Sequence, residues 1–112
     1  FHGSIVVREG LRQIDALQID KNLLLSDQAQ ANTKPAFWIY SDDVKCGHGA
    51  ASGQIDRNAI FYLTSRGISE SDARNLLVKG FVQEVIESIP NKFYKDKMDN
   101  MVNASLLDVL GI

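Results

Sequence analysis

The chain has 112 residues, of which 45% are apolar and 23% are charged, and its formal net charge at pH 7 is −2. This composition is typical of a globular domain and excludes a disordered polyelectrolyte, whose low apolar content cannot offset chain entropy. No apolar run approaches the roughly 20 residues of a membrane-spanning helix, and no basic stripe predicts a nucleic-acid surface. The single cysteine, Cys46, cannot form an internal disulfide and favours a reducing compartment such as the cytosol.

The first 57 residues predict short strands. Apolar bursts rich in β-branched and aromatic residues alternate with turn-forming residues, and they lie at residues 5–7, 23–25, 37–40 and 44–46. Pro35 cannot donate a ladder hydrogen bond, so we expect it at the start of its strand or on a sheet edge. Large apolar groups on both sides of residues 34–41 predict a strand that is covered on both faces. The loose spacing of the bursts suits stacked solenoid turns, which need neighbours to bury their apolar faces.

Beyond Arg57 the apolar period becomes helical. Residues 58–66 predict a short helix, with Asp56 or Asn58 as N-cap and Gly67 as the left-handed residue that ends it. Ser69 is expected to cap a second helix, which Pro90 ends. The apolar stripe of this second helix comprises Ala73, Leu76, Leu77, Gly80, Phe81, Val85 and Ile89. A glycine within the stripe, Gly80, suggests that a neighbouring helix approaches closely.

A third helix is expected over residues 91–110, ended by Gly111. Its apolar stripe comprises Tyr94, Met98, Met101, Val102 and Leu106. Strands followed by helices, without alternation, predict an α+β architecture. We expect residues 1–57 to form one domain and residues 58–112 to form a second, helical one. The first residues contain neither an initiator methionine nor a secretory signal, so we expect the chain to be cut from a longer protein.

The one segment that combines several reactive side chains surrounds Cys46 and His48. In an extended chain, residues two apart project from the same face, so the thiol and the imidazole would lie side by side. Such a pair suits iron, zinc or copper, or the activation of a thiolate. Two ligands do not complete a metal site. Two interpretations therefore stay open: a structural thiol beside an incidental histidine, and a metal half-site at His48 that another chain completes. The preceding Asp42 and Asp43 predict a solvated turn.

Longer phrases of the sequence are more specific than these spacings. Residues 33–35, 39–50, 53–56 and 61–68, in this order, resemble the C-terminal part of the SufB/SufD family of iron–sulfur cluster assembly proteins. The resemblance implies the last rungs of a right-handed parallel β-helix over residues 1–57, followed by a small C-terminal helical domain over residues 58–112. SufB-type members carry a functional cysteine where this chain has Leu63, and that departure favours the SufD type.

The resemblance also implies a function and its residues. The chain would be a non-enzymatic subunit of the cluster assembly scaffold, pairing with a SufB-like chain through its strands and docking a SufC-like ATPase through its helices. Cluster assembly would involve His48, with Cys46 beside it. No cofactor is expected on this chain alone, because the whole complex handles the iron–sulfur cluster transiently, in the cytoplasm or the plastid stroma. The ATPase-docking residues would be Phe61, Tyr62, Arg66, Leu77 and Phe81.

Two other functions stay open. The first is a small stand-alone metal-binding or thiol protein that uses Cys46 and His48. The second is a carbohydrate-binding module, for which Trp38 and Tyr40 are the only candidate aromatic pair. A solenoid with an open end exposes unpaired strand edges, so we also expect the chain to form a homodimer. We expect no nucleic-acid or membrane partner.

Overall fold

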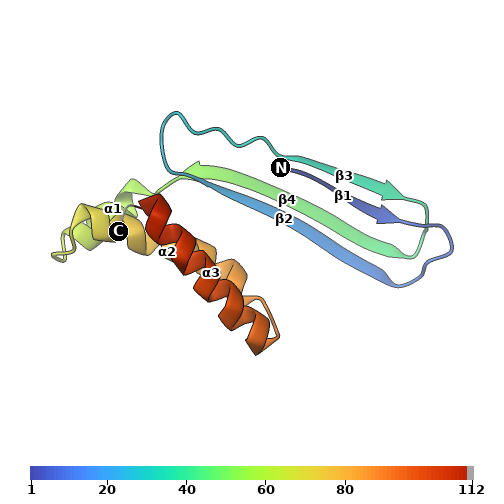
Figure 1. Cartoon of the computed structure of the whole chain (residues 1–112). Coiled ribbons are helices and arrows are strands. Elements are labelled where there is room, and N and C mark those ends of the chain that lie inside the picture. The colour runs from blue at the N-terminus through green and yellow to red at the C-terminus, as the bar shows by residue number, and fades with distance from the viewer. Residues whose placement is uncertain (111–112) are drawn as a thin grey trace. The chain divides into compact units, whose positions relative to one another are not determined.

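The computed structural model describes residues 1–110, which form four strands followed by three helices (Figure 1). The predicted α+β order is therefore confirmed. The chain divides into two compact units, which we call the strand unit (Phe1–Gln54) and the helical unit (from Ile55 onward).

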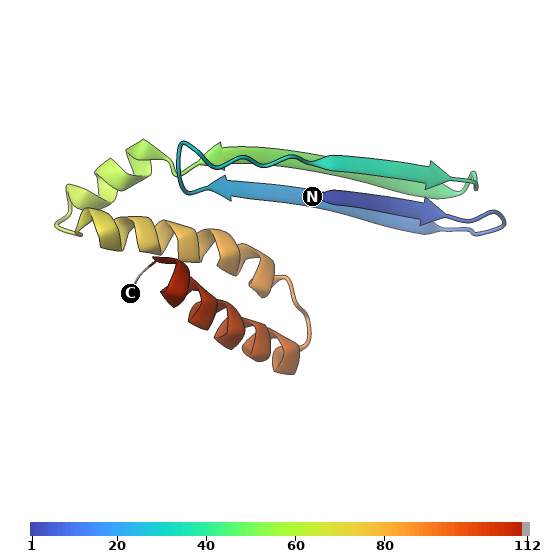
Figure 2. The same cartoon turned by 45° about the horizontal axis from the view of Figure 1, so that its top comes forward.

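The strand unit contains two parallel, two-stranded sheets. β1 (His2–Val7) pairs with β3 (Lys34–Ile39), and β2 (Ile14–Leu24) pairs with β4 (Val44–Gln54). β1 and β2 run in opposite directions and form a first pass of the chain. β3 and β4 repeat this path as a second pass, which stacks on the first (Figures 1 and 2). Each strand thus takes its hydrogen-bonding partner from the other pass.

The turns at the far end of the two passes are joined by hydrogen bonds. The backbone N–H of Gln13 donates to Asp43 Oδ2 at 2.9 Å, and that of Ile14 donates to the Asp43 carbonyl at 3.2 Å. Gln13 has a φ of +54°, a left-handed conformation that costs a non-glycine residue about 1 kcal/mol. The Asp43 carboxylate therefore anchors a strained corner, and the predicted turn at residues 42–43 is confirmed.

Two strands are much longer than predicted. β2 begins at Ile14, whereas the apolar burst at residues 23–25 predicted a strand of about four to six residues around it. β4 continues to Gln54 through a stretch rich in glycine, a residue that strand propensities disfavour. The two strands pair with each other over their whole length, and this pairing supplies ladder hydrogen bonds that local propensity does not reveal.

The expectations for the third strand had mixed outcomes. Pro35 is the second residue of β3, which has a neighbour on one side only, as predicted. The prediction that both faces of this strand are covered is wrong, because Trp38 and Tyr40 are 55% and 61% exposed. Val7 of β1 is the one buried apolar side chain among residues 1–54. The strand unit therefore has little core of its own.

In the helical unit, α1 (Arg57–Thr64) begins one residue before and ends two residues before the predicted helix over residues 58–66, and its predicted cap and glycine turn are both present. The Asp56 carboxylate accepts a hydrogen bond from the Asn58 N–H at 2.8 Å, which makes Asp56 the N-cap. After the helix, Gly67 has a φ of +90° and donates its N–H to the Thr64 carbonyl at 3.0 Å. This is the left-handed turn that glycine adopts without steric cost.

The second helix, α2 (Glu70–Glu87), begins at the predicted cap. The Ser69 hydroxyl accepts a hydrogen bond from the Asp72 N–H at 3.1 Å. The predicted apolar stripe is partly wrong: Leu76 and Val85 are exposed, and the buried residues are Ala73, Val78 and Ile86. Apolar residues lie on more than one side of this helix, and periodicity alone does not select the side that packs.

Gly80 does not mark a close helix approach. It is exposed, and a Cβ atom added to it would meet no atom within 4 Å. That expectation is therefore wrong.

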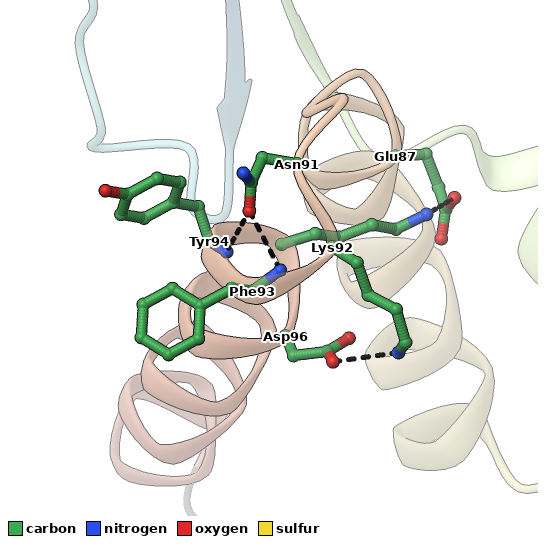
Figure 3. A network of polar contacts seen from close by, with 7 residues as sticks. Glu87, Asn91, Lys92, Phe93, Tyr94 and Asp96 are labelled. Carbon is green, nitrogen blue, oxygen red and sulfur yellow. Dashed lines mark hydrogen bonds and ion pairs between the residues drawn. The ribbon is translucent and has the colours of Figure 1, made fainter.

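The third helix, α3 (Lys92–Leu110), starts one residue later than predicted because Asn91 is its cap. The Asn91 Oδ1 atom accepts hydrogen bonds from the N–H groups of Phe93 and Tyr94, at 3.0 and 3.3 Å (Figure 3). An ion pair between Glu87 and Lys95 connects α2 with α3 (Figure 3).

The expected stripe of α3 is buried only in its second half. Tyr94, Met98 and Met101 are exposed, whereas Val102 and Leu106 are half-buried. The predicted terminator Gly111 lies outside the described residues. None of the three described helices has the length and hydrophobicity that crossing a bilayer requires.

Candidate functional site

The candidate site lies on what we call the inner face, the side of β2 and β4 that faces β1 and β3. Along β2, alternate residues from Ile14 to Asn22 are half-buried, and the residues between them are exposed. This is the alternation of a strand with one covered side. The register with β4 pairs Ala16 with Cys46 and Gln18 with His48. The inner face thus comprises Ile14, Ala16, Gln18, Asp20 and Asn22 on β2, and Val44, Cys46 and His48 on β4.

Cys46 and His48 leave β4 on the same side of an extended strand. The His48 ring packs edge-on against the ring of Phe37 in β3, with the ring centroids 5.1 Å apart and an interplanar angle of 77°. The Cys46 thiol is free and half-buried. Among residues 1–110, no group of three or more His, Cys, Asp or Glu side chains is arranged to hold a metal ion. Within this part of the chain the pair therefore has no third candidate ligand beside it.

A polar network continues the inner face beyond this pair. The Asn22 side-chain amide donates to Asp20 Oδ2 at 2.8 Å, to Thr33 Oγ1 at 3.2 Å and to Ser52 Oγ at 3.3 Å. The Thr33 hydroxyl also donates to Asp20. The hydrogen bonds from Thr33 and then Asn22 lower the pKa of the Asp20 carboxyl below its usual value. The network fixes the connection from β2 to β3 against the sheet formed by β2 and β4.

Sequence reasoning missed this network and Gln18. The strand over residues 14–22 was not recognised, so the alternation of Gln18, Asp20 and Asn22 was not assigned to one face. The signal was present in the sequence as polar residues at every second position.

The helical unit carries the residues expected to dock a partner. Phe61 and Tyr62 on α1 are 73% and 55% exposed, and the Arg66 guanidinium lies 4.4 Å from the centroid of the Tyr62 ring. This cation–π contact joins residues one helical turn apart. Leu77 and Phe81 on α2 are half-buried. The structure therefore presents the three residues around α1 to solvent and leaves the two on α2 partly covered.

A second exposed aromatic group was not predicted as a candidate site. Phe93 and Tyr94 at the start of α3 form an edge-to-face pair, with ring centroids 5.4 Å apart. Tyr94 was expected within an apolar stripe, and Phe93 was not singled out. Adjacent aromatic residues at a helix start were the available signal.

Comparison with known proteins gives one family for most of the chain. Residues 1–81 match the family model described as "SUF system FeS cluster assembly, SufBD core domain". This region includes the strand unit, the Cys46–His48 pair, α1 and the first part of α2.

Individual relatives extend the match into α3. The chain is 42% identical over 90 residues to an iron–sulfur cluster assembly SufBD family protein of Synechocystis, covering 80% of this chain and 20% of the relative. It is 40% identical over 106 residues to the chloroplastic protein ABCI7 of Arabidopsis thaliana, covering 95% and 22%. It is also 40% identical over 98 residues to the iron–sulfur cluster assembly protein SufD of Escherichia coli, covering 88% and 23%. The chain spans about a fifth of the length of these relatives.

Proposed function

Because the chain belongs to the SufBD family of the SUF iron–sulfur cluster assembly system, we propose that it acts in cluster assembly as a SufD-type, non-enzymatic subunit. The observation that carries this proposal is the Cys46–His48 pair, held on one face of β4 within the matched region. A thiol and an imidazole are ligands that iron accepts, and two of them form a site that a partner chain would complete. The cluster is then cargo of the complex, and this chain alone needs no resident cofactor.

The strand unit is proposed to be the last turns of a right-handed parallel β-helix. Two features support this. The second pass of the chain stacks on the first in continuous parallel register, and Val7 is the one apolar side chain buried among residues 1–54. A solenoid turn buries its surface against neighbouring turns, so a small internal core is expected of a terminal pair of turns.

The strand edges are the proposed surface for a SufB-like partner and for a second copy of this chain. Each sheet has two strands, so every strand has a neighbouring strand on one side only, and such edges favour pairing with another chain. We expect light scattering to detect a dimer of the purified chain, and a strict monomer at high concentration would contradict the homodimer. The proposed location is the cytoplasm or the plastid stroma, which agrees with bacterial relatives and one named as chloroplastic.

The helical unit is the proposed docking surface for a SufC-like ATPase. Phe61 is the strongest candidate residue because its ring is largely exposed, so Phe61→Ala removes contact area without opening a cavity. We expect this variant to be retained less by the immobilised ATPase than the unmodified chain. Phe93→Ala is the matched control, since Phe93 is an equally exposed aromatic on another helix. Equal losses in both variants would contradict the assignment to α1, and no retention of the unmodified chain would contradict docking altogether.

The role of His48 is tested by genetic complementation with the full-length protein. In a host lacking its own SufD-type protein, we expect His48→Ala to lower cluster assembly at least about tenfold, as loss of an essential metal ligand does. His2→Ala is the matched control, because His2 is exposed on β1. Undiminished assembly by His48→Ala would defeat the proposed role. One bound metal ion per purified monomer would instead favour the stand-alone metal protein.

A further inference from the structure

One aromatic contact within the strand unit supports the imidazole of His48. The ring of Phe37 in β3 meets the ring of His48 in β4, with the centroids 5.1 Å apart and the planes at 77°. Edge-to-face packing is a favoured arrangement of two aromatic rings, and it stabilises the pair beyond the surface that the pair buries. The contact therefore favours one orientation of the imidazole over the others.

The surroundings of His48 leave its imidazole accessible. Phe37 is half-buried, whereas His48 is exposed. The residues on either side of His48 are glycines, and a Cβ atom added to Gly49 would meet no atom within 4 Å. The ring is therefore supported by Phe37 and can still be reached by an ion or a partner chain.

An oriented but accessible side chain is what a half-site requires. A mobile histidine gives up rotamer freedom when it binds a metal ion, and this loss weakens binding. A ring that packing already holds in the binding orientation loses less, so a supporting neighbour strengthens a ligand without touching the ion. Phe37 lies on the strand that precedes β4, and it provides this support within the second pass of the chain.

We propose that Phe37 is a positioning residue for His48, its ring holding the imidazole in the side-chain rotamer that accepts a ligand. The inference rests on the proposed role of His48 in cluster assembly. Phe37 has no ligating atom, so it acts only through the orientation of His48. Its effect depends on the aromatic ring, because an aliphatic side chain fills the space but cannot form the edge-to-face contact.

The first test measures the rotamer populations of His48. Selective ¹³C and ¹⁵N labelling of histidine gives one signal set for His48 and one for His2, the other histidine of the chain, as an internal reference. Three-bond couplings report the χ1 populations of each. We expect Phe37→Leu to lower the ratio of the main His48 rotamer to the others about fivefold, through the loss of one aromatic pair. Phe37→Tyr retains the ring and should leave the ratio unchanged.

Trp38→Leu is the matched control. Trp38 is the next residue of β3, it is 55% exposed, and its side chain projects from the opposite face of the strand. Its loss removes an aromatic ring from the same strand and should leave the His48 ratio constant. The melting temperature identifies a purely structural role: a residue that only fills space would lower it in Phe37→Leu while the His48 ratio stays unchanged.

The second test is genetic complementation with the full-length protein. We expect Phe37→Leu to lower cluster assembly about fivefold, in step with the rotamer ratio, and Phe37→Tyr to assemble clusters normally. Should Phe37→Leu fail to fold, Phe37→Met decides the question, because its flexible side chain fills the same space without a ring.

An unchanged rotamer ratio in Phe37→Leu would overturn the inference, whatever the effect of His48→Ala on assembly. Normal assembly by Phe37→Leu under conditions in which His48→Ala is defective would overturn it as well. Normal assembly by His48→Ala together with a changed ratio in Phe37→Leu would uphold the orienting contact and defeat the proposed function.

Discussion

The strand unit and the helical unit are stabilised in different ways. The helical unit buries Ala73, Val78 and Ile86, and each of its helices begins at a side-chain cap. Among residues 1–54 Val7 alone is buried, and large apolar groups such as Leu17 and Ile19 are exposed on the outer side of β2. The helical unit thus has a small core of its own, although it also exposes large apolar side chains, whereas the strand unit buries a single apolar side chain and presents strand edges that a partner or a further turn would cover. The inner-face pair lies in the less self-sufficient unit.

The largest expected effect is the loss of the helical core. Ile86→Ala deletes most of a side chain that is 3% exposed, and we expect it to destabilise the helical unit by about 3 kcal/mol. Val85→Ala is the matched control on the same helix, because Val85 is 64% exposed and should change stability by less than about 0.5 kcal/mol. Urea unfolding followed by circular dichroism measures both. Similar losses would mean that α2 does not pack on the side described.

The corresponding test in the strand unit has a smaller expected effect. Val7→Ala should cost about 2 kcal/mol, because a valine that is 2% exposed loses two buried methyl groups. Val6→Ala, at the adjacent and exposed position, should be nearly neutral. Amide hydrogen exchange resolves the two units separately, and Val7→Ala should accelerate exchange in β1 to β4 while leaving α2 unaffected. Equal acceleration in α2 would show that the units do not unfold independently.

Replacing two glycines of the helical unit with alanine should change its stability in opposite directions. Gly67→Ala should destabilise by about 1 kcal/mol, because a φ of +90° is strained for a residue with a Cβ atom. Gly80→Ala should stabilise by about 1 kcal/mol, since the position is an exposed helix interior with open space around it. Thermal unfolding of the two variants gives the comparison. A loss of stability in Gly80→Ala would instead support the prediction from the sequence that a neighbouring helix approaches Gly80 closely.

The two units also differ in how far their sequence predicts them. The cap Ser69 and the glycine turn at Gly67 were predicted, and Asp56 was one of two predicted candidates for the first cap, because capping depends on residues within four positions of one another. The extents of β2 and β4 were not, because glycine-rich β4 is held as a strand by pairing with residues far away in sequence.

The candidate site, too, was predicted only where local sequence determines it. The shared side of Cys46 and His48 follows from strand alternation, which is local. The pairing of Gln18 with His48 depends on the register between two passes of the chain, and no local signal sets it. The sequence therefore predicted that Cys46 and His48 share one side of the strand, and it missed Gln18, which is paired with His48.

The smallest expected effect is the pH dependence of the contact between α2 and α3. Hydrogen bonds from Lys95 and then Gln83 lower the pKa of the Glu87 carboxyl (Figure 3). A carboxyl whose pKa is lower in the folded state adds stability above its unfolded pKa, and that contribution is lost as the pH falls through the lowered value. We expect Glu87→Gln to flatten the acidic limb of the stability curve, measured by urea unfolding between pH 7 and pH 3. Lys95→Met should flatten it in the same way, because it removes the other partner. The change should be small because the Glu87 side chain is 56% exposed and water screens the pair. An unchanged acidic limb in both variants would show that the pair contributes nothing to joining the helices.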